Sequence, residues 1–501
     1  MKKYARILSL LLALMMLLCM FVSCSGDGDD SKSSESFGKD TISAGGDDDP
    51  TDDDTIGEYD FKGADFIILA RDTTLYEYSV EYSAQSSIVE KAVYERNIKV
   101  GERFGVNIVV EPVAGEHENR SKFTTTMAAN MNESVSQWHM VSAHGTVISP
   151  QVFNGYCYDL KTLPEFDITK KWWSEEYYEE CNFGGKLFFA VGDIAHSMYE
   201  QLEVIFVNET LYTANHIGEN GNIDALYDLV RDGKWTWETF KKYVSDFTAE
   251  NVGGEDATYG LALNLHSFRA LHKGLDVQFT YRDTDNKVNF YQTLTERTVN
   301  VYDAMQSLLI DNQNVLCNKT FSHEAETQNK MFERGALLFY GQMLGQATQL
   351  REMSDVKGVL PYPKFDDLQE NYYTTGANSV SAIMVPRNIA PDSAEMVGVV
   401  VEALSMYGYH EVTPKYYEDT LTYQVIGTQN GMDMLNIIRD SYTMDFALAY
   451  TMAFGDDHAY AAFYKAFFDG ANLLSSTWKG YYGGLKGTLT GLYAIVNNQY
   501  K

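Results

Sequence analysis

The chain is poor in cysteine. Its 501 residues include five cysteines, and two of these, Cys19 and Cys24, lie close to the N-terminus. The other three, Cys157, Cys181 and Cys317, allow one disulfide at most, which excludes a small fold built around disulfides. Their spacing does not suit zinc, so we expect thiols that pack as small apolar side chains. The sequence leaves open whether two of them form a disulfide.

Positive charge is also scarce. The chain has 39 lysine and arginine residues against 70 aspartate and glutamate residues, and its net charge is −31. No basic stripe is long enough to cover a nucleic-acid backbone, so we expect no nucleic-acid partner.

Residues 25–58 lack apolar side chains almost completely and consist mainly of serine, glycine and aspartate. Such a segment cannot bury enough surface to offset the entropy of ordering it. Its aspartate clusters could be read as calcium ligands, but they lack the glycine and the terminal glutamate of a calcium loop. We therefore predict a disordered acidic tether over 24–58, and we expect no metal and no other cofactor.

The chain has one long apolar run, from Ile7 to Val22, and it follows a start that contains Lys2, Lys3 and Arg6. The run is shorter than the roughly 20 residues that a membrane-spanning helix needs. A charged start, an apolar core and a small residue at the cleavage point are typical of a secretory signal peptide. We predict that residues 1–23 are this signal.

Cys24 directly follows the small residue Ser23, which makes the signal typical of a bacterial lipoprotein. Its thiol would then carry diacylglycerol, and two or more acyl chains anchor a protein stably. This predicts a protein held at the outer face of the bacterial cytoplasmic membrane, at the cell surface or in the periplasm. A plain transmembrane anchor is the alternative interpretation.

The remaining residues are numerous enough for two sizeable cores and alternate between strand and helix patterns. A buried strand is expected at 64–70. A helix should follow, with Ser86 or Ser87 as its N-cap and Gly105 at its end, and then a strand at 106–110. This β-α-β order implies parallel strands. Further strands are predicted at 140–145, 202–207, 336–340, 358–360 and 381–385, and helices at 222–231, 236–249, 297–311, 393–408 and 431–441.

Three passages carry a resemblance to a known family. They are NFGGKLFFAVGDIAHSMYEQLEVIFVNETLY at 182–212, LYDLVRDGKWTWETFKKYVSDFT at 226–248, and FERGALLFYGQML at 332–344 followed by DVKGVLPYPKFDDLQENYYTTG at 355–376. In this order, behind a lipoprotein signal, they resemble an extracellular solute-binding lipoprotein of a carbohydrate ABC importer, in the maltose-binding-protein-like superfamily (family 1). The resemblance covers roughly residues 60–501.

The resemblance implies an α/β, two-lobed fold of the periplasmic-binding-protein type, with hinge crossovers near 196–208, 372–380 and 420–440 and a ligand cleft between the lobes. It also implies a receptor that is not an enzyme and that delivers a sugar or oligosaccharide to the transmembrane subunits of an ABC permease. We expect the first lobe to comprise 59–205 and 373–430, and the second lobe 206–372 and 431–501.

Ligands of open α/β sheets lie beyond the carboxyl ends of the strands. That rule and the resemblance together select residues that follow strands or lie in hinges. Since 13% of the chain is aromatic and the surface is acidic, a neutral oligosaccharide is favoured over an anionic ligand. We expect the cleft aromatics to be partly exposed. The candidate binding residues are Arg71, Asp72, His144, Tyr199, Glu200, Gln201, Tyr340, Gln342 and Trp478.

Enzyme motifs provide little support for catalysis. The sequence has no zinc-protease HExxH, no nucleophile elbow and no P-loop, and the Ser476–Lys479 match to S-x-x-K lacks its companion motifs. A glycosidase needs only two carboxylates, however, and no pattern among 70 acids excludes one. A surface-anchored glycan-active hydrolase therefore stays an alternative, as does an adhesive lipoprotein with no role in transport.

Overall fold

A computed structural model describes residues 53–500 with the exception of positions 80, 82, 253–255, 318–322, 378, 418–427, 456, 457 and 471. The predicted signal, the lipid-carrying Cys24 and most of the predicted tether lie outside the described residues. Within the described part of the chain, no helix is both long and apolar enough to cross a membrane.

The first sheet has the strand order β11-β3-β1-β2. It is formed by β1 (Ala64–Arg71), β2 (Val106–Val113), β3 (Met140–His144) and β11 (Ser381–Met384). Strands β2 and β3 pair with β1 in parallel, whereas β11 pairs with β3 in the antiparallel sense. The predicted β-α-β unit and the strands predicted at 140–145 and 381–385 are therefore confirmed.

Helix α2 (Ile88–Phe104) connects β1 and β2. Ser87 caps it, because its side chain accepts from the Glu90 amide while the Glu90 carboxylate accepts from the Ser87 amide. Gly105 ends the helix at φ 62°, a left-handed conformation that glycine adopts without strain. Both predicted boundaries are confirmed, and the N-terminus of α2 is held at the carboxyl edge of β1.

The second sheet has the strand order β10-β4-β9-β5-β8. Strand β5 runs parallel to β8 and β9, while β4 runs antiparallel to β9 and β10. Three of its strands, β4, β9 and β10, match predicted ones, whereas β5 and β8 were not predicted. The bounds are β4 (Glu203–Asn208), β5 (Tyr259–Leu263), β8 (Val315–Cys317), β9 (Leu337–Met343) and β10 (Lys357–Leu360).

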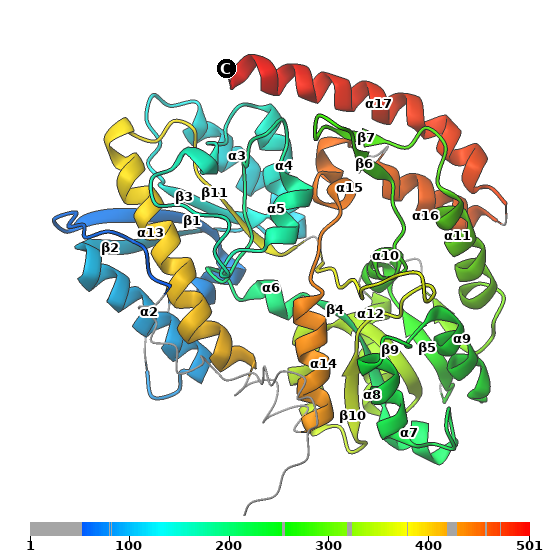
Figure 1. Cartoon of the computed structure of the whole chain (residues 1–501). Helices are drawn as coiled ribbons and strands as arrows, with labels where there is room; N and C mark the ends of the chain where they lie inside the picture. Colours follow the sequence, from blue (N-terminus) through cyan, green and yellow to red (C-terminus); the bar gives the residue numbers. More distant parts are fainter. Residues whose placement is uncertain are drawn as a thin grey trace, which may run out of the picture. The chain divides into compact units, whose positions relative to one another are not determined.

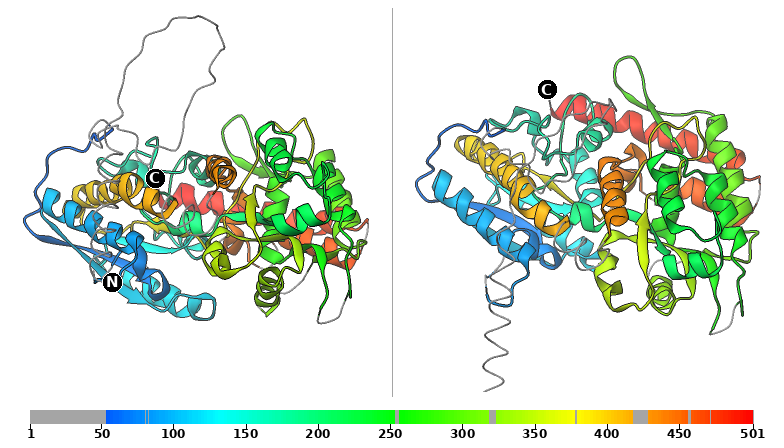
Figure 2. Two further views of the ribbon diagram at one scale, coloured as in Figure 1. Left: turned by 90° about the horizontal axis from the view of Figure 1, so that it is seen from below. Right: turned by 60° about the horizontal axis from the view of Figure 1, so that its bottom comes forward.

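Helices surround both sheets, and the elements of the two sheets lie on opposite sides in the views of Figures 1 and 2. All five helices predicted after residue 200 are present, as α8, α9, α11, α13 and α14. The helices are α3 (Arg120–Met131), α4 (Gly145–Phe153), α5 (Glu175–Cys181), α6 (Ser197–Glu200), α7 (Glu209–Ala214), α8 (Ile223–Arg231), α9 (Trp237–Asp246), α10 (Leu265–Gly274), α11 (Glu296–Leu309), α12 (His323–Glu333), α13 (Ala394–Tyr407), α14 (Gln429–Asp440), α15 (Phe446–Ala449), α16 (Ala459–Asp469) and α17 (Leu474–Gln499).

Three segments cross between the lobes side by side. The Ala377 amide donates to the Gln201 carbonyl at 2.9 Å, and the Thr374 amide donates to the Ser441 carbonyl at 2.8 Å. The first two crossovers lie where they were predicted. The third predicted crossover, 420–440, lies in part outside the described residues, and within the described part of the chain a further connecting segment follows α14 at 441–443. The chain is thus a two-lobed α/β protein with a hinge.

A second set of contacts joins the lobes away from the crossovers, through α17 (Figure 1). At its start, the Trp478 indole donates to the Tyr291 carbonyl beside the hairpin of β6 (Thr280–Arg282) and β7 (Val288–Phe290). Near its end, Tyr493 stacks on Phe183 with ring centroids 4.2 Å apart, and the Tyr500 hydroxyl donates to the Val152 carbonyl of α4. Helix α17 therefore packs against both lobes.

Glu203 is a fully buried carboxyl at the first crossover. One of its oxygens accepts a hydrogen bond from the Ser267 hydroxyl at 3.1 Å, and the other has no partner among the described residues. Burial disfavours the charged form and raises the pKa of Glu203 to about 8. The folded protein therefore holds a proton there that the unfolded chain releases at lower pH.

We expect Glu203→Gln to change how stability depends on pH. Because the folded-state pKa is raised, wild-type stability falls as pH rises from the usual glutamate pKa towards 8, by at most about 1.4 kcal/mol per pH unit. Chemical denaturation of both proteins across this range measures the effect, and the advantage of the variant should grow with pH. A constant difference between the two proteins would show that Glu203 ionises normally.

Candidate ligand-binding site

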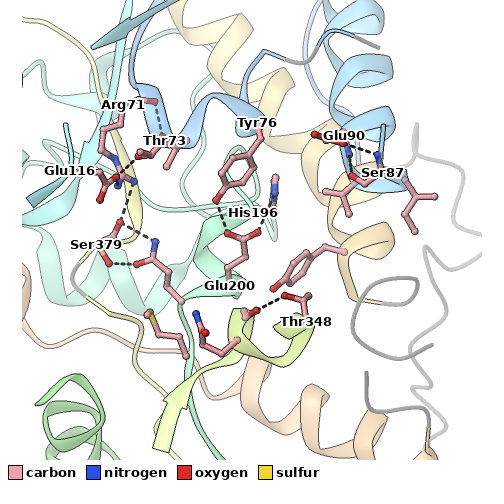
Figure 3. Close-up of a pocket in the computed structure, with 18 of the residues that line it drawn as sticks. Arg71, Thr73, Tyr76, Ser87, Glu90, Glu116, His196, Glu200, Thr348 and Ser379 are labelled. Carbon is pink, nitrogen blue, oxygen red and sulfur yellow. Dashed lines mark hydrogen bonds and ion pairs between the residues drawn. The ribbon is translucent and has the colours of Figure 1, made fainter. Parts of the chain in front are cut away.

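A cavity of about 1030 Å³ lies between the lobes at the hinge (Figure 3). This volume is at the upper end of the range for small-molecule sites. Residues from the β1 edge, the N-terminus of α2, the first two crossovers and the segment after β9 line it. The lining residues are Arg71, Thr73, Thr74, Tyr76, Ser86, Ser87, Ile88, Val89, Glu90, Glu116, His144, His196, Glu200, Gln201, Met343, Gly345, Gln346, Thr348, Ser379 and Tyr416.

Arg71, the last residue of β1, forms one wall and is 3% exposed. Its guanidinium contacts the His144 ring, lies 3.5 Å from the Glu116 carboxylate, and donates to the Ser379 carbonyl at 3.3 Å. Burial lowers the pKa of Arg71, and nearby carboxylates oppose that shift. Arg71 therefore serves mainly to fix the walls of the cavity, because acceptors of the protein already occupy both terminal nitrogens.

Behind this wall, Ser381 of β11 connects Arg71 to a buried carboxylate. Its hydroxyl accepts from Arg71 at 2.9 Å and donates to Glu77 at 2.7 Å. Glu77, the last residue of the 3-10 helix η1 (Asp72–Glu77), also accepts from the Ser197 amide at 2.9 Å. These bonds join the β1 edge to the first two crossovers.

Glu200 projects from α6 into the middle of the cavity (Figure 3). Its carboxylate accepts from the Tyr76 hydroxyl at 2.7 Å and lies 3.7 Å from Nε2 of His196. Burial raises the pKa of Glu200 to about 7, although the Tyr76 hydrogen bond opposes the shift. Burial lowers the pKa of His196 to about 3, so this histidine is neutral and gives Glu200 no counter-charge.

Gln201 and Ser379 form the floor where the first two crossovers meet. The Gln201 amide donates to the Ser379 carbonyl at 3.2 Å, and the Ser379 hydroxyl donates back to the Gln201 side chain. Across the cavity, Gln346 accepts from Asn329 at 3.1 Å. Amide and hydroxyl groups therefore face the cavity from both lobes and can bond ligand hydroxyls.

Of the nine candidate residues from the sequence, Arg71, His144, Glu200 and Gln201 line the cavity. Gln342 lies in β9 behind it, where its amide donates to the Tyr340 hydroxyl at 2.7 Å. Asp72 is exposed beside the cavity, and the buried Tyr199 hydroxyl donates to Asp193 at 2.8 Å. The other two, Tyr340 and Trp478, lie in the core.

The expectation that Tyr340 and Trp478 are partly exposed is wrong. Tyr340 is 0% exposed, because β9 is a central strand that is covered on both faces. Trp478 is 2% exposed and stacks on Phe279 with ring centroids 5.6 Å apart. Its position in the sequence suggested a short helix near the hinge, whereas it belongs to the first turns of the long α17.

The sequence analysis missed most of the aromatic and hydroxyl-bearing residues that line the cavity. Tyr76 and Thr73 belong to η1, a short helix that directly follows β1, and the strand-end rule could have found them. Tyr416 lies beyond α13, and Thr348 lies in the 3-10 helix η4 (Leu344–Glu352) after β9. Nothing in their local sequence marks these two residues, since only the packing of the lobes brings them to the cavity. The described residues contain no cluster of potential metal ligands.

Comparisons with known proteins agree with this geometry. No protein-family model matches the chain, and no curated protein matches it by sequence. Among solved structures, UgpB from Mycobacterium tuberculosis in complex with glycerophosphocholine aligns with a TM-score of 0.53 at 12% identity, over 88% of this chain and 99% of that one. The chain therefore has the same fold as this protein.

Two further structures show the same fold. A cyclo/maltodextrin-binding protein complexed with maltotetraose aligns with a TM-score of 0.51 at 12% identity, covering 87% of this chain and 98% of that one. An ABC-transporter-associated binding protein from B. animalis subsp. lactis, in complex with β-1,6-galactobiose, also aligns at 0.51 and 12% identity, over 85% and 98%. The expected two-lobed fold is therefore confirmed.

Trp478→Ala should destabilise the protein and leave ligand affinity unchanged. Removing a buried tryptophan leaves a cavity and costs about 3–5 kcal/mol, and Trp478 does not line the site. Urea denaturation measures the loss, and Lys479→Ala, an exposed neighbour on the same helix, is the control. If Trp478→Ala bound ligand more weakly while its stability were unchanged, Trp478 would have to be a binding residue after all.

Proposed function

We propose that this protein is a lipid-anchored extracytoplasmic solute receptor that captures a sugar or oligosaccharide between its lobes and delivers it to an ABC permease. The observation that carries the proposal is the polar and aromatic cavity at the hinge of a two-lobed solute-binding fold. The ligands named for the neighbours are the oligosaccharides maltotetraose and β-1,6-galactobiose and the phosphodiester glycerophosphocholine, and all three carry hydroxyl groups.

The cavity lining suits a polyhydroxylated ligand. Serine, threonine and glutamine side chains supply donors and acceptors, and the rings of Tyr76 and Tyr416 offer apolar surface. A sugar ring presents hydroxyls at its rim and C–H groups on its faces, so it satisfies both kinds of surface. Of the sequence candidates, we assign ligand contact to His144, Glu200 and Gln201, whereas Arg71 fixes the wall beside them.

Binding without turnover is expected. The carboxylates that line the cavity differ in environment, since Glu90 accepts from the Ser87 amide, Glu116 lies beside Arg71 and Glu200 lies beside Tyr76. Calorimetry against a panel of plant and host oligosaccharides tests the proposal, with sugar analysis after incubation. Saturable binding with intact sugar supports a receptor, whereas cleavage of a glycoside would favour the surface hydrolase.

The lobes should close on the ligand by rotation about the three crossovers. A saturating ligand identified by calorimetry is then expected to lower the radius of gyration measured by small-angle scattering. Gln201→Ala, which removes a side chain from the floor of the site, should shift the closure to higher ligand concentration. A radius that stays constant at saturation would indicate a rigid cleft of the kind found in many enzymes.

Cys24→Ser should abolish lipid attachment, because the serine hydroxyl cannot replace the thiol that is alkylated. The expected result is loss of palmitate labelling and release of the protein into the medium, or its retention as an unprocessed precursor. Cys157→Ser, which alters a buried thiol of the first lobe, is the matched control. Continued labelling of the Cys24→Ser protein would show that the anchor is assigned wrongly.

A further inference from the structure

No cation among the described residues contacts the Glu200 carboxylate in the cavity. Its side chain is 29% exposed, and its near partners are the Tyr76 hydroxyl and the neutral His196 ring. The further charge that acts on it is Glu77, which has the same sign. Arg71 supplies the one guanidinium among the described residues that line the cavity. It is already bound to Ser379, Ser381 and Glu116.

Three rings adjoin this carboxylate. The ring of His196 lies 5.2 Å from the ring of Tyr76 and 5.9 Å from the ring of Tyr416, tilted by 57° and 40°. They come from η1, from the segment before α6 and from the segment beyond α13, so the tertiary fold assembles them around Glu200. Aromatic rings attract a cation through their quadrupole, and the attraction strengthens where water is excluded.

A second observation independently points to a ligand. Tyr416 lines the cavity and is 4% exposed, yet its hydroxyl has no hydrogen-bond partner among the described residues. The His196 ring lies beside both groups, since its centroid is 5.9 Å from that of the Tyr416 ring and its Nε2 is 3.7 Å from the Glu200 carboxylate. Burial raises the pKa of Tyr416, and the charge of Glu200 adds to that shift. A buried hydroxyl without a partner is costly, and a ligand group that bonds to both Glu200 and Tyr416 would remove that cost.

We propose that the ligand carries an ammonium group that binds against Glu200, between Tyr76, His196 and Tyr416. The proposal rests on the proposed receptor function, and the ligand class it names is a saccharide with a free amine. The ammonium would donate to the Glu200 carboxylate and to the Tyr416 oxygen, both of which accept. A sugar hydroxyl could donate to one of them but would not neutralise the charge.

The same arrangement selects against anions. A phosphate or a uronic-acid carboxylate at this point would face Glu200 with the same charge and no free guanidinium to offset it. A hydroxyl in place of the amine keeps nearly the same size and loses the charge, so cellobiose distinguishes recognition of charge from recognition of shape. An N-acetyl group also removes the charge but adds bulk.

Calorimetry with three β-1,4-linked disaccharides tests the proposal: the glucosamine dimer, its N-acetylated form, and cellobiose, which has hydroxyls in place of the amines. Choline serves as a fourth probe, since its cation is permanent and it is no sugar. We expect the glucosamine dimer to bind about 10-fold or more tightly than either neutral disaccharide, the scale of a charge-assisted hydrogen bond.

The variants separate charge from shape. Glu200→Gln keeps the size of the side chain and removes its charge, so it should abolish the preference for the amine: the glucosamine dimer should then bind no more tightly than cellobiose. Tyr416→Phe, which removes one hydroxyl, should reduce the preference in part. Glu219→Gln, a change of equal charge at an exposed position of the second lobe, is the matched control and should have no effect.

The outcomes distinguish the two proposals. Binding of neutral disaccharides with no preference for the amine, in wild type and in Glu200→Gln alike, would overturn the ammonium site and leave the receptor function intact. Binding of choline alone, lost in Glu200→Gln, would retain the ammonium site and overturn the saccharide ligand. Binding of none of the four probes, with no shift in melting temperature, would contradict both.

Discussion

The bonds that join Arg71, Ser381 and Glu77 are the interaction on which the hinge and the site depend. Two buried opposite charges share one hydroxyl, at 2.9 Å and 2.7 Å, and this connects the end of β1 to β11 and, through Ser197, to the first crossover. Loss of Glu77 would leave Arg71 with the more exposed Glu116 as its ionic partner, and loss of Arg71 would leave the buried Glu77 with neutral hydrogen-bond donors, so either change is expected to destabilise the protein. The same bonds occupy the guanidinium of Arg71, so the cavity keeps an acidic character.

Much of the fold was predictable because the strands of this chain are continuous apolar runs. Strands β1, β2, β3, β4, β9, β10 and β11 and helix α2 follow such runs or regular helical stripes. Strand β8 lacks that signal, since it is three residues long and only partly buried. Strand β5 (YGLAL) carries the signal and is fully buried, but it was overlooked. Helix α17 was not predicted because its five glycines, at Gly480, Gly483, Gly484, Gly487 and Gly491, disfavour a helix locally. Packing against α16 and both lobes offsets that cost.

The site was predictable only where strand ends determine it. Arg71, His144, Glu200 and Gln201 follow strands or occupy a crossover that the family resemblance located. Tyr416 and Thr348 reach the cavity through contacts between segments far apart in the chain, which local patterns do not encode. The sequence did not reveal burial either. Tyr340 and Trp478 have the aromatic side chains that stack on sugars, but both are buried in the core.

The pairing of β11 with β3 has a consequence for how the chain reaches its native state. Strand β11 pairs across almost half of the polypeptide, with Ser381 opposite His144, and Tyr500 at the far end bonds to Val152. Contacts of such long sequence separation form slowly, because loop closure must precede them. A chain that emerges N-terminus first therefore cannot complete the sheet of its first lobe until residues of the second lobe have emerged. Until then, the β3 edge stays open to incorrect pairing, the situation in which chaperones are needed.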